Sequence, residues 1–151
     1  MALLGDHRSV SKSTVWIGGA TDALQLHLDE QEATIDKRWE WMVRIVDAGR
    51  AIAERGFPLD VHAEVHLTID DDVLPRNAGR FVLSVADGRG ELRPGGTGRL
   101  RTHVRGLAAV YTSHLTAHEA ARAGLMGGTD DDLARLSACF AGPAPWMSDF
   151  F

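Results

Sequence analysis

The sequence predicts an α+β fold in which a mostly antiparallel sheet carries the C-terminal helices on one face. Two observations lead to this prediction. Short stretches in which apolar and polar residues alternate, a pattern typical of half-buried strands, occur up to about residue 105. From residue 107 onward, apolar residues recur at helical spacing instead. Strands followed by helices indicate that the helices cover one face of a sheet.

The first third of the chain contains three candidate strands. Residues 14–17 are β-prone and end at two glycines, and leucines alternate with polar residues over 24–28. The alternation is clearer over 39–46, where two tryptophans, a valine and an isoleucine share one side. We therefore expect strands at these three places.

A short helix is expected over 48–55. Asp47 suits its N-cap, because the carboxylate can accept amide hydrogens of the first turn. Gly56 suits a left-handed stop at the other end.

Further strands follow this helix. Residues 61–69 alternate, with Val61, Ala63, Val65, Leu67 and Ile69 on one face. A second strand begins near Phe81, and Asp87-Gly88 predicts a tight hairpin to a third strand that contains Leu92. The last alternating stretch, 99–105, has one cationic face.

Three helices are predicted after the strands. The first begins near Leu107, the second opens with a capping box over 116–119 and closes at Gly124, and the third opens at Thr129 and ends at Gly142. The buried stripe expected for the third helix is Leu133, Leu136 and Phe140.

Composition limits the class of partner. The chain has 151 residues, 44% of them hydrophobic, and a net charge of −5 from 16 basic and 21 acidic residues. This balance disfavours nucleic acid and anionic membranes and is compatible with a cationic ligand. Its single cysteine excludes an internal disulfide and fits a reducing cytosol, and no apolar stretch is long enough to span a bilayer. We expect a cytoplasmic protein with no membrane or nucleic-acid partner.

Two clusters of polar side chains could form sites, and each has a simpler interpretation. His62, Glu64 and His66 share one strand face and could hold a divalent metal, but alternate strand residues lie roughly 7 Å apart, which favours a solvated face and no metal. The cationic face of 99–105 could bind an anion, form a solvated face, or contact another part of a longer protein. Cys139 lies near an apolar stripe and is expected to be a buried, inert thiol.

The C-terminal tail, residues 143–151, carries the strongest functional signal. It is apolar, contains two prolines and ends in two phenylalanines, so we expect it to be docked rather than solvated. Docking would carry along the main-chain carboxylate of Phe151, which makes that group the candidate catalytic base. Trp146, Asp149 and Phe150 are the candidate substrate-binding residues beside it.

Several segments resemble the enhanced intracellular survival family of N-acetyltransferases. They are 41–47 with the alanine-rich helix that follows, 77–81, 104–111 and the Ala-Pro-Trp…Phe terminus. In that family two tandem GNAT (Gcn5-related N-acetyltransferase) folds precede a C-terminal domain with a sterol-carrier-protein-like α+β fold. Residues 38–151 resemble this last domain, and residues 1–37 resemble, more weakly, the end of the second GNAT-like fold.

The resemblance implies a specific chemistry. The first GNAT fold binds acetyl-CoA and supplies a tyrosine acid, and the terminal carboxylate reaches its active site as the base for an amine such as an aminoglycoside. That role maps onto Phe151, and desolvation by Trp146, Phe150 and Phe151 would raise the pKa of the carboxylate from an ordinary value of about 3.5. Some relatives have an acidic residue directly before the last residue. This chain has Phe150 at that position and Asp149 one residue earlier. The resemblance also implies homo-oligomers.

The acetyl-CoA motif is absent from this chain, which therefore has no cofactor of its own and is not expected to catalyse acetyl transfer without the preceding GNAT domains. Two other functions remain open at this point. One is a sterol-carrier-like module that binds a lipid or another apolar ligand, and the other is a structural oligomerisation domain.

Overall fold

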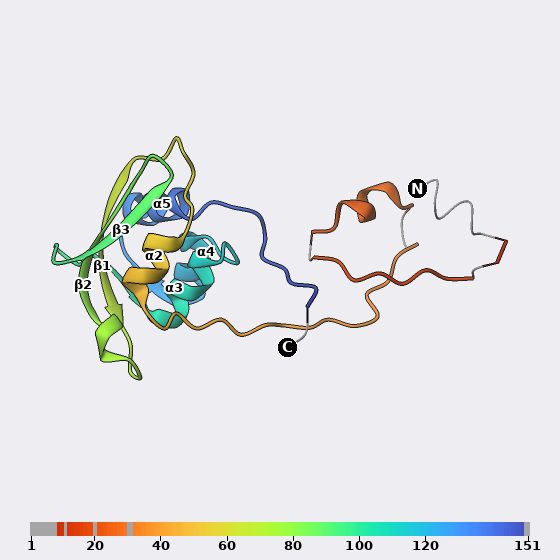
Figure 1. The fold of residues 1–151 in the computed structure, drawn as a ribbon, viewed down its shortest axis with the longest axis horizontal. Helices are drawn as coiled ribbons and strands as arrows, with labels where there is room; N and C mark the ends of the chain where they lie inside the picture. The colour runs from red at the N-terminus through yellow and green to blue at the C-terminus, as the bar shows by residue number, and fades with distance from the viewer. Residues whose placement is uncertain (1–8, 11, 20, 30–31, 150–151) are drawn as a thin grey trace. The chain divides into compact units, whose positions relative to one another are not determined.

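The computed structural model describes residues 9–10, 12–19, 21–29 and 32–149. The chain divides into two compact units (Figure 1). The larger unit is formed by residues 42–143, and the smaller unit contains the described residues of the ranges 1–41 and 144–151.

The larger unit contains a five-stranded sheet with the strand order β3-β2-β1-β4-β5. Strand β1 pairs antiparallel with β2 and parallel with β4, and the β2–β3 and β4–β5 pairs are antiparallel. The bounds of the strands are β1 Ala63–Asp70, β2 Gly79–Ala86, β3 Arg89–Pro94, β4 Leu100–His103 and β5 Met126–Gly127. The predicted mostly antiparallel sheet is thus confirmed.

The α-helices of this unit lie on one side of the sheet (Figure 1). They are α2 Ala48–Glu54, α3 Val104–Tyr111, α4 Ala117–Arg122 and α5 Asp130–Cys139. The buried face of β1 carries Val65, Leu67 and Ile69, each at most 1% exposed, which join buried residues of the helices in one hydrophobic core. Burial of this apolar face is the main force that holds the helices on the sheet.

Three local sequence features of this unit, a helix cap, a hairpin turn and a capping box, form the structures that the sequence predicts. Asp47 caps α2, where its Oδ1 accepts a hydrogen bond from the Arg50 amide at 2.9 Å. Asp87 and Gly88 have φ angles of +50° and +74°, the left-handed pair that a two-residue hairpin between β2 and β3 requires. Thr116 and Glu119 form the predicted capping box of α4.

Predicted ends of three elements are wrong. Helix α2 ends at Glu54 with an extended C-cap at Arg55, not at a left-handed Gly56. The strand expected over 99–105 spans only Leu100–His103, because the His103 side chain accepts the Arg105 amide at 3.2 Å and caps the start of α3. Helix α5 ends at Cys139, before Gly142.

The three strands expected in the first third are not formed. Residues 14–17 and 39–46 carry no helix or strand, and residues Ala23–His27 form the 3₁₀ helix η1 in place of the expected strand. Asp22 caps η1, where its carboxylate accepts the Leu24 amide at 2.9 Å, and this local bond competes with an extended backbone. An alternating stretch becomes a strand only when a neighbouring strand accepts its backbone hydrogen bonds.

A glycine-rich segment crosses the open face of the sheet. Strands β3 and β4 both run parallel to β1 but lie on opposite sides of the β1–β2 pair, so residues 95–99 must pass over these two strands. The Thr97 amide donates to His66 Nδ1 at 2.9 Å, and Thr68 Oγ1 donates to the Gly98 carbonyl at 2.9 Å. We call residues 95–99 the crossing segment.

A buried carboxylate holds the loop after β1. The Asp71 side chain is 0% exposed and accepts hydrogen bonds from Arg44 Nη2 at 2.6 Å and Asn77 Nδ2 at 2.9 Å. The amides of Val73 and Leu74 also donate to it, both at 3.0 Å. This loop includes the 3₁₀ helix η2, Pro75–Asn77. Among the described residues, no helix is both long and apolar enough to cross a membrane.

Candidate functional site

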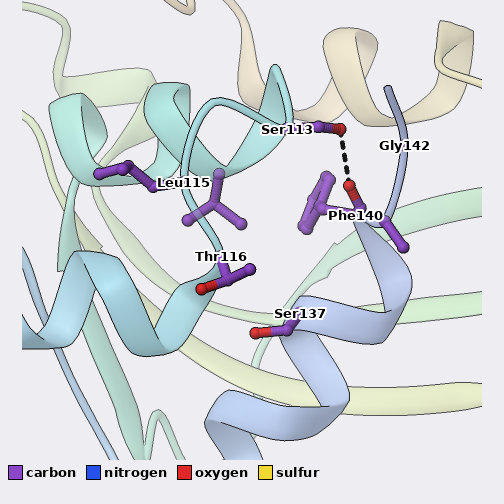
Figure 2. Close-up of a pocket in the computed structure, with 8 residues that line it drawn as sticks. Ser113, Leu115, Thr116, Ser137, Phe140 and Gly142 are labelled. Carbon is purple, nitrogen blue, oxygen red and sulfur yellow. Dashed lines mark hydrogen bonds between the residues drawn. The ribbon is translucent and has the colours of Figure 1, made fainter. Parts of the chain in front are cut away.

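The C-terminal tail leaves the larger unit after Phe140, whose carbonyl is held by hydrogen bonds. Beyond α5, the Phe140 carbonyl accepts a hydrogen bond from Ser113 Oγ at 2.7 Å, drawn as a dashed line in Figure 2. Arg55 Nη2 donates to the same carbonyl at 3.3 Å. Because these donors satisfy a carbonyl at the end of α5, they define where the tail begins.

Arg55 hydrogen-bonds to carbonyls at the C-terminal ends of α3 and α5. Its Nε donates to the Tyr111 carbonyl of α3 at 3.0 Å, and its Nη1 donates to the Gly56 carbonyl at 2.7 Å. The guanidinium carbon also lies 5.0 Å from the ring centroids of Phe57 and Phe140 and 5.7 Å from that of Tyr111. A cation is favourable at helix C-termini and over aromatic faces. Burial lowers the pKa of Arg55 somewhat, but an arginine stays protonated in proteins.

We call Arg55 and Ser113, which both donate to the Phe140 carbonyl, the anchor residues. A cavity of about 210 Å³ lies beside Ser113 and Phe140 (Figure 2). It opens among the end of α3, the start of α4 and the end of α5. Apolar and hydroxyl-bearing residues line it: Val110, Ser113, Leu115, Thr116, Ser137, Phe140, Ala141 and Gly142. Its volume is below the roughly 300–1,000 Å³ that is usual for ligand pockets.

The hydroxyls of this cavity have structural partners. Ser137 Oγ accepts the Ala117 amide at 3.0 Å and lies 3.4 Å from His118 Nδ1. Thr116 Oγ1 accepts the Glu119 amide at 3.2 Å as part of the capping box. Since an activated nucleophile needs a short bond to its base and a free lone pair, we assign these hydroxyls to the capping of α4 rather than to catalysis.

Cys139 is buried at the end of α5, as expected. Burial raises the pKa of its thiol to about 11. The thiolate is therefore scarce at neutral pH, and the side chain contributes packing rather than reactivity.

The predicted site residues lie in the smaller unit, and the structure describes two of them. Trp146 is 56% exposed and packs against the backbone of Gly19, where an added Cβ would lie 3.1 Å from Trp146 Cγ. Asp149 is exposed. Phe150 and Phe151 lie outside the described residues, so the role of the terminal carboxylate stays a prediction.

The described part of the tail is less enclosed than expected. Every residue from 141 to 149 is exposed and carries no helix or strand. Trp146 of this segment contacts Gly19, and residues 144–149 cluster with the described residues of the range 1–41.

Both ring nitrogens of His66 are used within the protein. Nε2 lies 3.0 Å from Glu64 Oε1, and Nδ1 accepts the Thr97 amide. Within the described ranges, no group of three or more His, Cys, Asp or Glu side chains could hold a metal ion.

The cationic face of 99–105 is partly neutralised by acidic side chains. Arg99 Nη2 lies 3.1 Å from Asp132 Oδ1, and His103 Nε2 lies 3.2 Å from Asp72 Oδ1. These pairs disfavour an anion site on this face, since nearby carboxylates compete with an anionic ligand.

The anchor residues Arg55 and Ser113 were not identified from the sequence. Arg55 follows directly on a helix end, where a basic residue is common, and Ser113 lies in a short connection between helices. Neither residue belongs to a sequence motif. The carbonyls to which they donate belong to Gly56, Tyr111 and Phe140, which are far apart in the sequence.

The fold and the pattern of buried residues define the class of protein. The chain belongs to the sterol carrier protein domain family, which matches residues 48–148. A search of curated proteins finds no match.

Solved structures of longer proteins contain a similar part. A GCN5-related N-acetyltransferase from Anabaena variabilis ATCC 29413 is 43% identical with a TM-score of 0.93, over 99% of this chain and 38% of that chain. A GCN5-related N-acetyltransferase from Kribbella flavida is 43% identical with a TM-score of 0.67, over 72% of this chain and 28% of that one. Eis1 from Mycobacterium abscessus is 30% identical with a TM-score of 0.62, over 72% and 27%. This chain thus spans less than two fifths of each relative's length.

Proposed function

We propose that this chain is the C-terminal part of a GNAT-type N-acetyltransferase of the enhanced intracellular survival kind. Its substrates are amines such as aminoglycosides, and the terminal carboxylate of Phe151 is the catalytic base. Preceding GNAT domains would be the partner that binds acetyl-CoA. Similarity to three N-acetyltransferase structures, one of them over 99% of this chain, supports the proposal.

The base has a defined task in this reaction. Acetyl-CoA would supply the acetyl group as a thioester on the preceding domains. The carboxylate would accept a proton from the substrate nitrogen as that nitrogen forms its bond to the acetyl carbon. The carbon–sulfur bond would break, and CoA would leave as a thiolate that the tyrosine acid of the first GNAT fold would protonate. A carboxylate does this better when apolar neighbours raise its pKa, because a stronger base takes the proton more readily.

The smaller unit offers chemistry suited to a cationic amine. Trp146 is half exposed, Asp149 is exposed two residues before the terminus, and aromatic faces and carboxylates both attract ammonium groups. The chain as a whole carries a net charge of −5, which favours the approach of a cation.

One observation carries the proposal most directly. The tail begins at the carbonyl that Ser113 and Arg55 hold, and it continues through exposed residues 141–149 that form no helix or strand. A segment of this kind is anchored at one end and can reach a catalytic centre with the other.

The test uses a chimera in which this chain replaces its counterpart in the Anabaena variabilis relative. Four residues, Gly-Ser-Gly-Ser, are appended after Phe151, which moves the carboxylate away. We expect the turnover of an aminoglycoside or polyamine to fall by about 100-fold or more, the usual contribution of a general base. The same four residues at the N-terminus serve as the control, and undiminished turnover with the extended C-terminus would refute the base role.

A sterol-carrier-like module for apolar ligands is the second candidate, because the family match favours it. The structure argues against a large ligand between sheet and helices, since Leu67, Leu83 and Leu107 are each at most 1% exposed within a continuous core. A lipid that copurifies in native mass spectra of the chain would support this second function. Homo-oligomerisation and a cytoplasmic location remain expectations, the first measurable by light scattering.

A further inference from the structure

Two adjacent glycines of the smaller unit, Gly18 and Gly19, leave room for side chains that lie against them. An added Cβ at Gly18 would overlap Asp22 Oδ2, and one at Gly19 would lie 3.1 Å from Trp146 Cγ and 3.3 Å from Trp146 Cβ. Neither glycine has a positive φ, so a larger residue there would meet these side chains and not a forbidden backbone conformation. The need for glycine at position 19 is therefore set by its contact with the C-terminal tail.

The Asp22 carboxylate fixes the segment that Trp146 contacts. Its Oδ2 accepts the indole hydrogen of Trp16 Nε1 at 2.9 Å, and its Oδ1 accepts the Leu24 amide at 2.9 Å. These two bonds connect the residue before the glycines to the 3₁₀ helix η1 that follows them. Because Gly19 lies inside this closed segment, Trp146 contacts a surface with a defined local shape, although 56% of Trp146 is exposed.

The start of the tail is held in the larger unit. The Phe140 carbonyl accepts hydrogen bonds from Ser113 Oγ at 2.7 Å and from Arg55 Nη2 at 3.3 Å. Gly142 passes close to the same anchor residues, since an added Cβ there would lie 2.9 Å from Ser113 Oγ. Ser113 itself has a φ of +59°, and a left-handed backbone is uncommon for a residue other than glycine. The anchor residues thus determine where the tail begins.

The sequence between these two contacts makes the tail stiff. Pro143 and Pro145 fix their own φ angles and favour an extended backbone at the residues before them. Proline-rich segments of this kind act as semi-rigid spacers. The tail is therefore held at Phe140 within the larger unit and at Trp146 within the smaller unit, and the residues after Trp146 lead to the terminal carboxylate.

We propose that Trp146 is a positioning residue for the base, and that its contact with Gly19 keeps the Phe151 carboxylate near the reacting amine. The inference rests on the proposed function, because the position of that carboxylate matters only if it takes the proton. It gives Trp146 a task that does not depend on contact with the substrate, and it adds Gly19 as the residue against which Trp146 is held.

Chain length gives the expected size of the effect. A fully extended chain spans at most about 18 Å from Trp146 to Phe151 but about 40 Å from Phe140 to Phe151. The effective concentration of a tethered group falls roughly with the −3/2 power of tether length, so loss of the Trp146 contact should lower it about threefold. A general base contributes about 100-fold or more. Release of Trp146 should therefore weaken turnover without abolishing it.

Gly19→Val in the Anabaena chimera displaces Trp146 while every other side chain of the tail is kept. The chimera is a suitable background, because the relative is similar over 99% of this chain. We expect kcat for an amine to fall about threefold and KM to stay the same, since no contact with the amine is removed. Gly127→Val is the matched control: Gly127 is exposed, an added Cβ meets nothing within 4 Å, and both constants should keep the parent's values.

Substitutions of Trp146 test whether the two residues act through one contact. Trp146→Ala should lower kcat as much as Gly19→Val does, and the double variant should have no lower kcat than either single variant. Trp146→Phe keeps an aromatic ring that can lie against Gly19, so it should recover most of the lost kcat.

Fluorine NMR of this chain, labelled with 5-fluorotryptophan, measures the contact without any turnover. The Trp146 signal is the one that Trp146→Phe removes. We expect its chemical shift to differ from that of a labelled peptide of residues 141–149, and to move to the peptide's value in Gly19→Val. Gly127→Val should leave it unchanged.

Three results would overturn the inference. They are a Trp146 signal identical in chain and peptide, a Gly19→Val enzyme in which only KM changes, and a Gly19→Val enzyme with the parent's kcat. The proposed function fails separately: a chimera whose Phe151 carboxylate is converted to a carboxamide without loss of turnover has no carboxylate base. If the carboxamide is inactive and Gly19→Val is fully active, only the positioning role of Trp146 fails.

Discussion

Asn77 and Asp71 connect the chain before α2 to the loop after β1. Asn77 is 1% exposed, accepts the Ala48 amide at 2.9 Å and donates to the Ile45 carbonyl at 3.2 Å and to Asp71. Buried polar groups are stable only when their hydrogen bonds are made, and no buried side-chain nitrogen or oxygen of the described residues lacks a partner. This network therefore fixes how the chain enters the larger unit.

The Asp71 carboxylate should make stability depend on pH. Burial alone would raise its pKa, but hydrogen bonds from Asn77, the Leu74 and Val73 amides and Arg44 outweigh burial and hold the pKa well below the ordinary 3.8. A lowered folded-state pKa contributes stability that is present above the unfolded value and is lost as the pH falls below it. We expect the urea midpoint to fall between pH 5 and pH 2.

Asp71→Asn tests the source of that pH dependence. The variant should be less stable than the parent at pH 7, and its urea midpoint should change less between pH 5 and pH 2. Asp60→Asn, at an exposed position of the same unit, is the control and should retain the parent's slope. A parent and an Asp71→Asn variant with the same slope would show that other carboxylates dominate.

Arg55→Met should destabilise the larger unit by about 2 kcal/mol, because the Tyr111 and Phe140 carbonyls each lose a hydrogen bond, although Ser113 still donates to the Phe140 carbonyl. Arg55→Lys keeps the charge but not the planar fork that reaches several acceptors, so it should recover only part of the loss. Chemical denaturation measures both. A fully stable Arg55→Met protein would mean that Ser113 alone holds the Phe140 carbonyl.

At the scale of elements, the sequence predicts those structures that local chemistry determines. Strand β1, the Asp87-Gly88 hairpin and the capping box at Thr116 follow from alternation, from turn residues and from side-chain caps, and the structure contains each of them. The expected stripe of α5 is also confirmed, since Leu133, Leu136 and Phe140 are at most 5% exposed.

Elements that depend on distant partners were not predictable in this way. The alternation over 39–46 is a property of the sequence, but the strand needs a second strand that the described chain does not provide. The Arg55 anchor likewise joins helix ends that only the fold brings together. For the candidate site, the sequence indicates Trp146 and Asp149 through the character of the tail, while the anchor emerges only from the geometry.

Gly96 should be required for the crossing segment. It has a φ of +84°, and an added Cβ would lie 2.6 Å from His66 Nδ1 and 2.7 Å from Val82 Cγ2. Gly95 also has a left-handed φ, +120°, but a Cβ there would meet nothing within 4 Å. We expect Gly96→Ala to lower the Tm more than Gly95→Ala does, because backbone strain is shared by both and the steric overlap is not.

Thermal unfolding of the two glycine variants checks this difference directly. Equal losses of Tm would mean that the left-handed backbone, and not the close approach to β1 and β2, sets the need for glycine in this segment.

At the scale of the whole molecule, the two units have different physical characters. The larger unit buries its apolar residues and satisfies its buried polar side chains, and it belongs to the sterol carrier protein domain family. The smaller unit buries none of its described residues fully, and it includes the described tail residues from 144 onward. The two units therefore differ in how much apolar surface they bury.

The terminal carboxylate of Phe151 is the proposed base, and a single chemical change tests that role. Peptide ligation can convert the Phe151 carboxylate of the Anabaena chimera to a carboxamide, which keeps its size and removes its basicity. We predict that the kcat for an amine substrate falls by about 100-fold or more while backbone hydrogen exchange is unchanged. A carboxamide enzyme as active as the free acid would contradict the role of the carboxylate as base.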